Sequence, residues 1–355
     1  MHKKSLTFLK RLLDSPGPSG FETAPARVWR EEAATIADEV SADVSGNSVA
    51  VLNPEGTPRI MLAGHIDEIG LMIVHIDDDG FLYFSTIGGW DPQVLVGQRV
   101  LIAARNRLVE GVIGKRAVHM LDEEERDQVS KVSALWIDIG AKSKKDALRR
   151  VRVGDPAVVA APTVQLPNDR LVSRSIDNRM GAFVVLEALR RLTPRKPRAA
   201  VFAVATSQEE ISWTGGGART SATRIDPDVA LIVDVTHATD HPNADKKKYG
   251  DFKLGGGPII SRGSATNPKV VELLIATAEE KKIPFTLAAA PSDTGTDADA
   301  IYSARQGIAT GLVSIPNRYM HSPNEMVALA DLDRTAGLMA AFARKVTART
   351  DFTPR

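Results

Sequence analysis

Buried strands alternate with helices along this sequence, and one long β-rich segment interrupts the alternation. A continuous apolar run, typical of a strand buried on both faces of a sheet, occurs at residues 59–63. Further strands are predicted at 199–205, 229–233 and 308–313. Apolar periodicity predicts helices over residues 5–13, 22–39, 180–192, 268–282 and 331–347. Because strands that alternate with helices usually pair in parallel, the sequence predicts an α/β fold with a mainly parallel sheet flanked by helices.

The interruption spans residues 69–165 and has the pattern of a separate β domain. Asp79-Gly80 marks a tight turn between two strand-like runs, and further short β-rich runs follow, mostly separated by breaks that contain Gly or Asp. Helical periodicity is scarce there outside residues 144–150. We therefore predict a small all-β, barrel-like domain, inserted into an α/β domain built from residues 1–68 and 166–355.

Composition narrows the chemistry that this chain can perform. It contains no cysteine, which excludes disulfides, thiolate nucleophiles and cysteine-ligated zinc or iron–sulfur sites. Any metal would be held by histidine, aspartate and glutamate, and there are only seven histidines. The 45 Lys and Arg residues nearly balance the 44 Asp and Glu residues, which argues against a nucleic-acid partner.

The N-terminal segment differs from a secretory signal. Lys10 and Arg11 interrupt its apolar run, and no small-residue cleavage site follows. No stretch approaches the roughly 18 to 20 apolar residues that a membrane span needs. We expect a cytoplasmic protein without a membrane partner.

Polar side chains gather where the predicted strands end. Because functional groups in such a sheet lie beyond the carboxyl ends of its strands, five clusters in this position form a coherent set. Each alone has an ordinary explanation, such as a loop histidine or a helix N-cap aspartate. The set comprises His65 with Asp67, Asp177, the adjacent Glu209 and Glu210, Asp234, and His321.

Two imidazoles and several carboxylates suit two divalent metal ions that share a bridging carboxylate. Zn²⁺ and Co²⁺ are the ions that fit nitrogen and oxygen ligands of this kind. Paired ions polarise a carbonyl, lower the pKa of a water molecule and stabilise a tetrahedral oxyanion. One glutamate of the Glu209-Glu210 pair could bind metal while the other acts on the water as a general base. The sequence thus predicts metal-assisted hydrolysis.

Six motifs in order resemble the glutamyl aminopeptidase and tetrahedral (TET) aminopeptidase family, metallopeptidase family forty-two of clan MH. The motifs are GHIDEIG, SIDNRMGA, SQEE, IVDVTHATD, GTDADAI and IPNRYMHSPNE. The resemblance spans about residues 5–345 and includes the β-rich segment. It implies a di-zinc aminopeptidase fold and an enzyme that removes N-terminal residues from short peptides.

The resemblance also implies the ligands of the two metals. His65 and Asp234 would bind one ion, and His321 and Glu210 would bind the other. Asp177 would bridge both. The ions would be zinc, or alternatively cobalt.

Further roles follow from the same resemblance. Glu209 would be the general base that deprotonates the metal-bridging water and then protonates the leaving amine. Asp67 would orient His65, and the peptide bond Asp177-Asn178 would be cis. Thr296 and Asp297 would lie near the substrate.

Assembly is a third implication of the resemblance. The insert would be a PDZ-like dimerisation domain, and dimers would assemble into a tetrahedral dodecamer with its active sites facing the interior. One departure concerns the loop after the Glu pair, where relatives read Val-Gly-Leu-Arg-Gly-Ala and this chain reads ISWTGGGA. Trp213 in that loop could narrow a specificity pocket or belong to the core.

Two other functions compete with this interpretation. A glycoside hydrolase of the endoglucanase type would use two carboxylates without metal, but it gives no role to His65 and His321. A non-enzymatic, metal-stabilised assembly protein built on the β insert would leave the Glu pair without a function.

Overall fold

The computed structural model spans residues 1–355 and describes all of them except 106 and 213. Its centre is an eight-stranded sheet, in which β12, β3, β13 and β16 are mutually parallel. Across the sheet the order is β1 (Glu39–Ala42), β2 (Ser48–Leu52), β12 (Ala200–Thr206), β3 (Arg59–His65), β13 (Val229–His237), β16 (Ala309–Asn317), β14 (Ile259–Gly263) and β15 (Thr286–Ala290).

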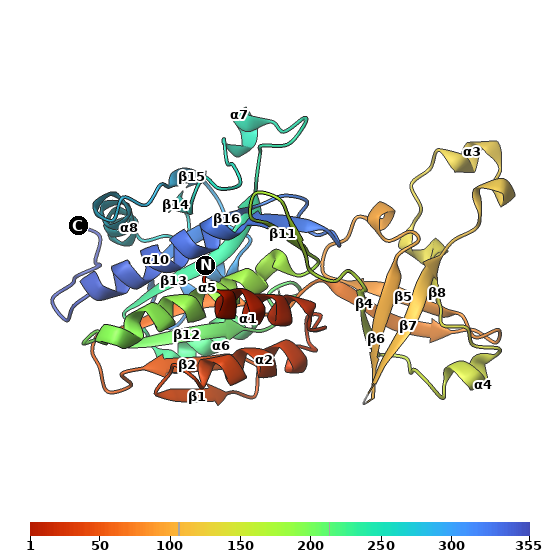
Figure 1. Ribbon diagram of the computed structural model, residues 1–355, viewed down its shortest axis with the longest axis horizontal. Coiled ribbons are helices and arrows are strands. Elements are labelled where there is room, and N and C mark those ends of the chain that lie inside the picture. Colours follow the sequence, from red (N-terminus) through yellow and green to blue (C-terminus); the bar gives the residue numbers. More distant parts are fainter. Residues whose placement is uncertain (106, 213) are drawn as a thin grey trace.

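Helices cover both faces of this sheet (Figure 1). The alternation of side chains along each strand sends one set of apolar residues to each face. One face packs against α1 (Lys3–Asp14), α2 (Thr23–Ala33), α5 (Ile176–Leu192), α8 (Pro268–Glu280) and α10 (Leu329–Lys345). The other packs against α6 (Gly216–Ile225) and α9 (Asp297–Ile301).

A separate closed barrel projects from one end of the sheet domain (Figure 1). Its core is apolar and includes Leu71, Phe84 and Ile102. Around the barrel the order is β4 (Gly70–Ile76), β5 (Leu82–Ile87), β8 (Trp136–Asp138), β7 (Arg107–Gly114), β6 (Arg99–Ala104) and β9 (Pro156–Val159). Its connections hold η1 (Pro92–Val94), η2 (Val118–Met120), α3 (Glu123–Arg126), η3 (Val132–Ala134) and α4 (Lys144–Ala147).

A three-stranded antiparallel sheet lies where the chain returns from the barrel. It pairs β10 (Val164–Leu166) with β11 (Arg170–Ser173), and β11 with β17 (Glu325–Ala328). This sheet holds the segment just before α5 beside the segment just before α10. Two further short helices are η4 (Thr193–Arg195) and α7 (Lys246–Tyr249).

The predicted α/β fold with a barrel-like insert is confirmed, and several boundaries differ. The helix predicted over 22–39 ends at Ala33, because the chain turns and Glu39 enters β1. β13 continues to His237, since its pairing with β16 persists that far. Trp213 lies outside the described residues. No helix in the described part of the chain is long and apolar enough to cross a bilayer.

Candidate metal centre

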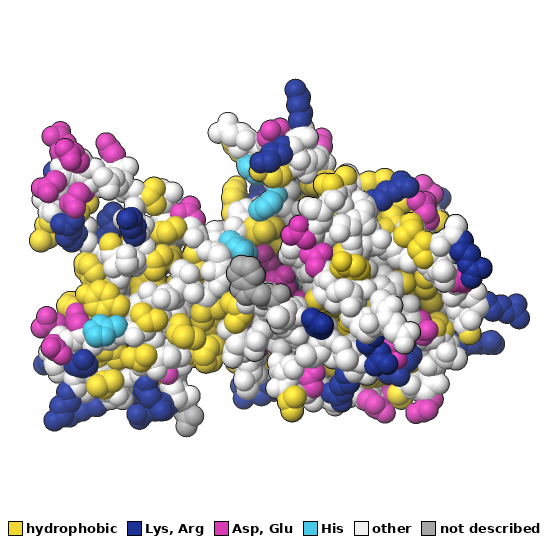
Figure 2. Space-filling model, turned by 180° about the vertical axis from the view of Figure 1, so that it is seen from behind, with side chains coloured by type: hydrophobic (Ala, Val, Ile, Leu, Met, Phe, Trp, Pro, Cys, Tyr) yellow, Lys and Arg dark blue, Asp and Glu magenta, His cyan; other side chains and the backbone are white. Residues whose placement is uncertain are grey.

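The parallel strands deliver most of the candidate site to one edge of the sheet. His65 is the last residue of β3 and lies opposite Thr206, the last residue of β12. Glu209 and Glu210 follow in the turn after β12. Figure 2 shows histidine and acidic side chains gathered in a hollow between the sheet domain and the barrel.

Asp234 and Asp177 also lie at this edge, but neither follows the end of a strand of the central sheet as predicted. Asp234 lies within β13 instead of ending it, because the strand continues past the level of β3. Asp177 follows no strand of the central sheet, since β11 belongs to the three-stranded sheet. It lies in the first turn of α5, where the backbone departs from helical geometry and the Asp177-Asn178 peptide bond is cis.

The six side chains predicted to bind metal or to act as base lie close together around His65 and His321. Nε2 of His65 lies 3.2 Å from Oδ1 of Asp177, 3.7 Å from Oε2 of Glu209 and 3.9 Å from Oδ1 of Asp234. Nε2 of His321 lies 3.4 Å from Oδ2 of Asp177 and 3.4 Å from Oε2 of Glu210. The two carboxylate oxygens of Asp177 therefore face different imidazoles.

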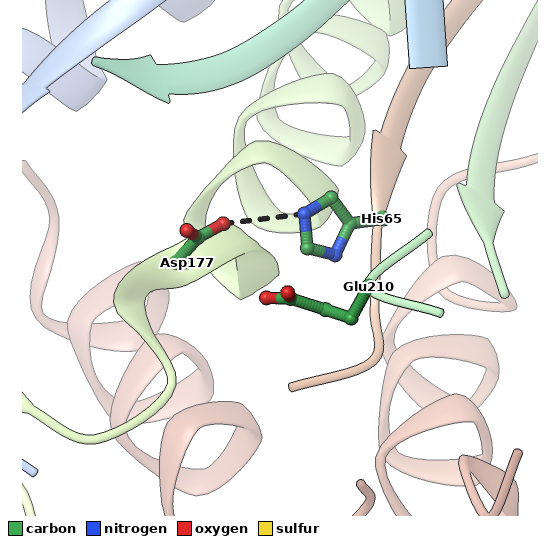
Figure 3. A group of neighbouring side chains, drawn as sticks. All are labelled: His65, Asp177 and Glu210. Carbon is green, nitrogen blue, oxygen red and sulfur yellow. Dashed lines mark ion pairs between the residues drawn. The ribbon is translucent and has the colours of Figure 1, made fainter. Parts of the chain in front are cut away.

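Figure 3 shows three of these side chains at close range. The carboxylates of Asp177, from the first turn of α5, and of Glu210 point into the same space beside the His65 ring. The dashed line marks the ion pair between His65 and Asp177. The arrangement places donors from a strand, a turn and a helix around a common centre.

Burial and mutual repulsion set the charge state of these carboxylates. Burial raises the pKa of Asp234 and of Glu210 well above the usual value, and the charge of Asp177 adds to the rise. Burial also opposes ionisation of Asp177, but the hydrogen bonds from His321 and His65 outweigh it and lower its pKa. Carboxylates held this closely are stabilised by positive charge placed between them.

The donor set fits a divalent metal centre. Within the described residues, ligand atoms of His65, Asp177 and Glu210 lie within 4.8 Å of one another, as do those of His65, Glu209 and Asp234. Oε1 of Glu210 is buried and has no hydrogen-bond partner in the part of the chain that the structure describes. Imidazole nitrogens and carboxylate oxygens without thiolate are ligands that Zn²⁺ and Co²⁺ accept.

Asp67 positions two parts of this centre at once. Its Oδ1 lies 3.4 Å from Nδ1 of His65 on the side away from the other carboxylates. Its two oxygens also accept the backbone N–H groups of Glu209, at 3.2 Å, and Glu210, at 3.1 Å. A carboxylate behind a ligating histidine fixes the ring orientation and raises its basicity.

A cavity of about 710 Å³ opens beside the cluster. Thr296, predicted to lie near the substrate, is part of its wall. Asp297 is buried, and its carboxylate accepts a hydrogen bond from the Thr206 hydroxyl. Arg219 and His237, to which the sequence analysis gave no role, also line the cavity.

The sequence reasoning missed one buried glutamate at this site. Glu325, the first residue of β17, accepts hydrogen bonds from the backbone N–H groups of Asp177 and His321. It is the last residue of the IPNRYMHSPNE motif, which also contains His321. However, no sequence signal distinguishes a carboxylate that accepts backbone N–H groups from one that faces solvent.

Comparisons with known proteins agree with this fold. The M42 glutamyl aminopeptidase family matches residues 46–338. The lysyl aminopeptidase of Pyrococcus furiosus is 35% identical over 98% of both chains.

Two solved structures also resemble the chain closely. The TET aminopeptidase of a marine sediment Thaumarchaeota archaeon superposes with a TM-score of 0.92, at 34% identity over 97% of both chains. The TET1 peptidase of Pyrococcus horikoshii, described as assembling into a tetrahedron or a large octahedral shell, gives 0.85 at 30% identity over 96% of this chain and 100% of its own. The chain therefore belongs to the M42 glutamyl aminopeptidase family of metal-dependent aminopeptidases.

Proposed function

We propose that this protein is a di-metal aminopeptidase that removes N-terminal residues from short peptides. The observation that carries the proposal is the placement of Asp177, whose two oxygens face His65 and His321 separately. His65 and Asp234 would hold one ion, His321 and Glu210 the other, and Asp177 would contact both. Two divalent ions supply Lewis acidity, which polarises the scissile carbonyl and lowers the pKa of water.

Glu209 is the residue best placed to move protons. Its side chain keeps 17% exposure, against 5% for Glu210, so its carboxylate is the more accessible of the pair from the cavity. We assign Glu209 to take a proton from the attacking water and deliver it to the leaving amine. Asp67 holds the backbone of both glutamates and so keeps Glu209 directed at the reaction site.

The Glu209→Gln variant tests the assignment of the base. An amide cannot take up the proton, so we expect kcat on an aminoacyl anilide to fall by about 10² to 10⁴-fold. Metal content and the far-UV circular dichroism spectrum should match the wild type. The exposed Glu39→Gln variant, on the edge strand β1, should retain full activity. Near-normal turnover by Glu209→Gln would remove this residue from the mechanism.

The preferred substrate can be identified with a panel of aminoacyl anilides and added Zn²⁺ or Co²⁺. Activity on any member supports the peptidase, and the same panel distinguishes zinc from cobalt. If no member of the panel is hydrolysed, the non-enzymatic, metal-stabilised assembly protein is favoured. If the protein still hydrolyses a β-glucan after its metal has been removed by exhaustive chelation, the glycoside hydrolase is favoured.

We further propose that the protein self-associates, with the barrel as a dimerisation domain and a tetrahedral dodecamer as the final assembly. The barrel exposes Leu108 and Val112 on β7, and the TET1 relative is described as forming a tetrahedron. Analytical ultracentrifugation should give twelve times the 38.2 kDa of one chain. The cytoplasmic location stays a prediction, which cell fractionation would test.

A further inference from the structure

Asp177 and His321 belong to distant parts of the chain, yet one buried carboxylate joins their backbones. Oε2 of Glu325 accepts the N–H of Asp177 and Oε1 accepts the N–H of His321, each at 2.9 Å. The residue is 1% exposed. Each oxygen is thus committed to the main chain of a different candidate ligand.

This arrangement repeats the one around Asp67. Asp67 is fully buried and accepts the N–H groups of Glu209 and Glu210. The two carboxylates therefore act on different pairs of residues. Between them they hold the backbone of four of the six converging side chains.

Glu325 is costly to bury in this position. Within the described residues it has no ion pair with Lys, Arg or His, and its hydrogen-bond partners are the two backbone N–H groups. A buried carboxylate without a cationic partner is normally eliminated or neutralised. The two backbone N–H groups that Glu325 accepts belong to Asp177 and His321, which are both candidate metal ligands. This geometry links Glu325 directly to two candidate metal ligands and gives its burial a specific reason.

We infer that Glu325 is a positioning residue for both metals, with its larger effect on the ion held by His321. Asp177 is also anchored by α5, whereas His321 lies in the loop between β16 and β17. The inference rests on the proposed di-metal function. In Glu325→Gln, one oxygen becomes an NH₂ group that opposes an N–H donor. One of the two contacts is then lost.

The test measures Zn²⁺ binding to the metal-stripped full-length protein by titration calorimetry. Wild type should bind two ions per chain. Because loss of a partner behind a metal ligand typically weakens binding by about 10 to 100-fold, Glu325→Gln should show at least that loss for one ion and a smaller loss for the other. Added Zn²⁺ should restore its kcat on an aminoacyl anilide, with KM close to the wild-type value.

Glu187→Gln is the matched control. Glu187 is a buried carboxylate on α5, and it accepts hydrogen bonds from Ser5 and Arg190 without touching the metal centre. Its variant should bind both ions with wild-type affinity. If Glu325→Gln does not fold, Glu325→Asp keeps the charge but is too short to reach both N–H groups, and it should show the same selective loss.

The outcomes separate this inference from the proposed function. If the wild type binds two ions and the Glu325→Gln or Glu325→Asp variant binds them as tightly as the wild type does, the inference is overturned. The proposed function then still stands. An equal loss of Zn²⁺ affinity in Glu187→Gln also overturns the inference, because removal of any buried carboxylate would then weaken metal binding. A wild type that binds no ions overturns the proposed function and the inference together.

Discussion

At the level of single residues, the candidate metal centre depends on buried charges that lie outside its own six side chains. The carboxylate of Glu68 accepts a hydrogen bond from Nη2 of Arg179 at 2.8 Å, and it lies 3.1 Å from Nε of Arg174. All three side chains are buried. Arg179 also donates to the backbone carbonyls of Ile66 and Gly17. This network fastens the turn after β3 to the first turn of α5, and so places His65 relative to Asp177.

The Arg179→Met variant should therefore be strongly destabilised. It leaves the Glu68 carboxylate buried without one of its two cations, and removal of one partner of a buried pair costs about 3 to 5 kcal/mol. Urea unfolding followed by circular dichroism measures the free energy of unfolding. Arg224→Met, an exposed substitution on α6, should change that free energy by less than about 0.5 kcal/mol. If the two variants have the same free energy of unfolding, the network does not contribute to stability.

At the level of elements, the distance between β3 and α5 sets the geometry of the centre. A Cβ atom on Gly64 would lie 2.5 Å from the carbonyl carbon of Gly181 and 2.8 Å from the backbone nitrogen of Ala182. Both are main-chain atoms, which cannot move without moving the helix. Gly64 precedes His65, and Gly181 follows Asp177 by four residues. Close approach at these glycines thus brings His65 within 3.2 Å of Asp177.

Gly64→Ala is expected to displace α5 from β3. Overpacking of this kind typically costs about 1 to 3 kcal/mol. The displacement would also separate His65 from Asp177, so Zn²⁺ affinity should fall together with stability. Gly337→Ala on α10 is the matched control, because its nearest neighbour is the flexible end of Arg191 and alanine favours a helix. The interpretation fails if Gly64→Ala binds Zn²⁺ as tightly as Gly337→Ala does.

At the level of the whole molecule, the candidate metal centre gathers acidic segments whose charges repel one another unless a cation lies between them. Asp177, Glu209, Glu210 and Asp234 come from α5, from the turn after β12 and from β13. Ions held between them would bind the folded chain and not the unfolded one, so metal binding should contribute directly to stability.

Removal of metal should therefore lower the melting temperature. At a Zn²⁺ concentration 100 times the dissociation constant, one occupied site adds about 2.7 kcal/mol to the free energy of unfolding. Thermal unfolding with EDTA and then with excess Zn²⁺ measures the difference. Asp177→Asn, which weakens the proposed bridging ligand, should show a much smaller response. A melting temperature that changes with neither EDTA nor Zn²⁺ would contradict a metal site within the folded core.

The sequence predicted those parts of the fold whose local pattern is strong. The buried strands at 59–63 and 199–205 and the long helices α5 and α10 have apolar patterns that few alternatives satisfy. It did not predict α6, which begins with two glycines and has small residues on its buried face. The short edge strands β1 and β15 were also missed, because their exposed residues carry no clear apolar alternation.

For the centre, the sequence by itself determined the inventory of donors. Without cysteine, and with polar residues following apolar strands, it identified His65, Asp177, Glu209, Glu210, Asp234 and His321 as one set. Only the tertiary structure decided how they meet. It gave each oxygen of Asp177 its own imidazole, and it made Glu325 a partner of two distant backbone N–H groups. Those relations depend on α5 packing against β3 and on β17 pairing with β11, contacts between residues far apart in the chain that no local pattern encodes.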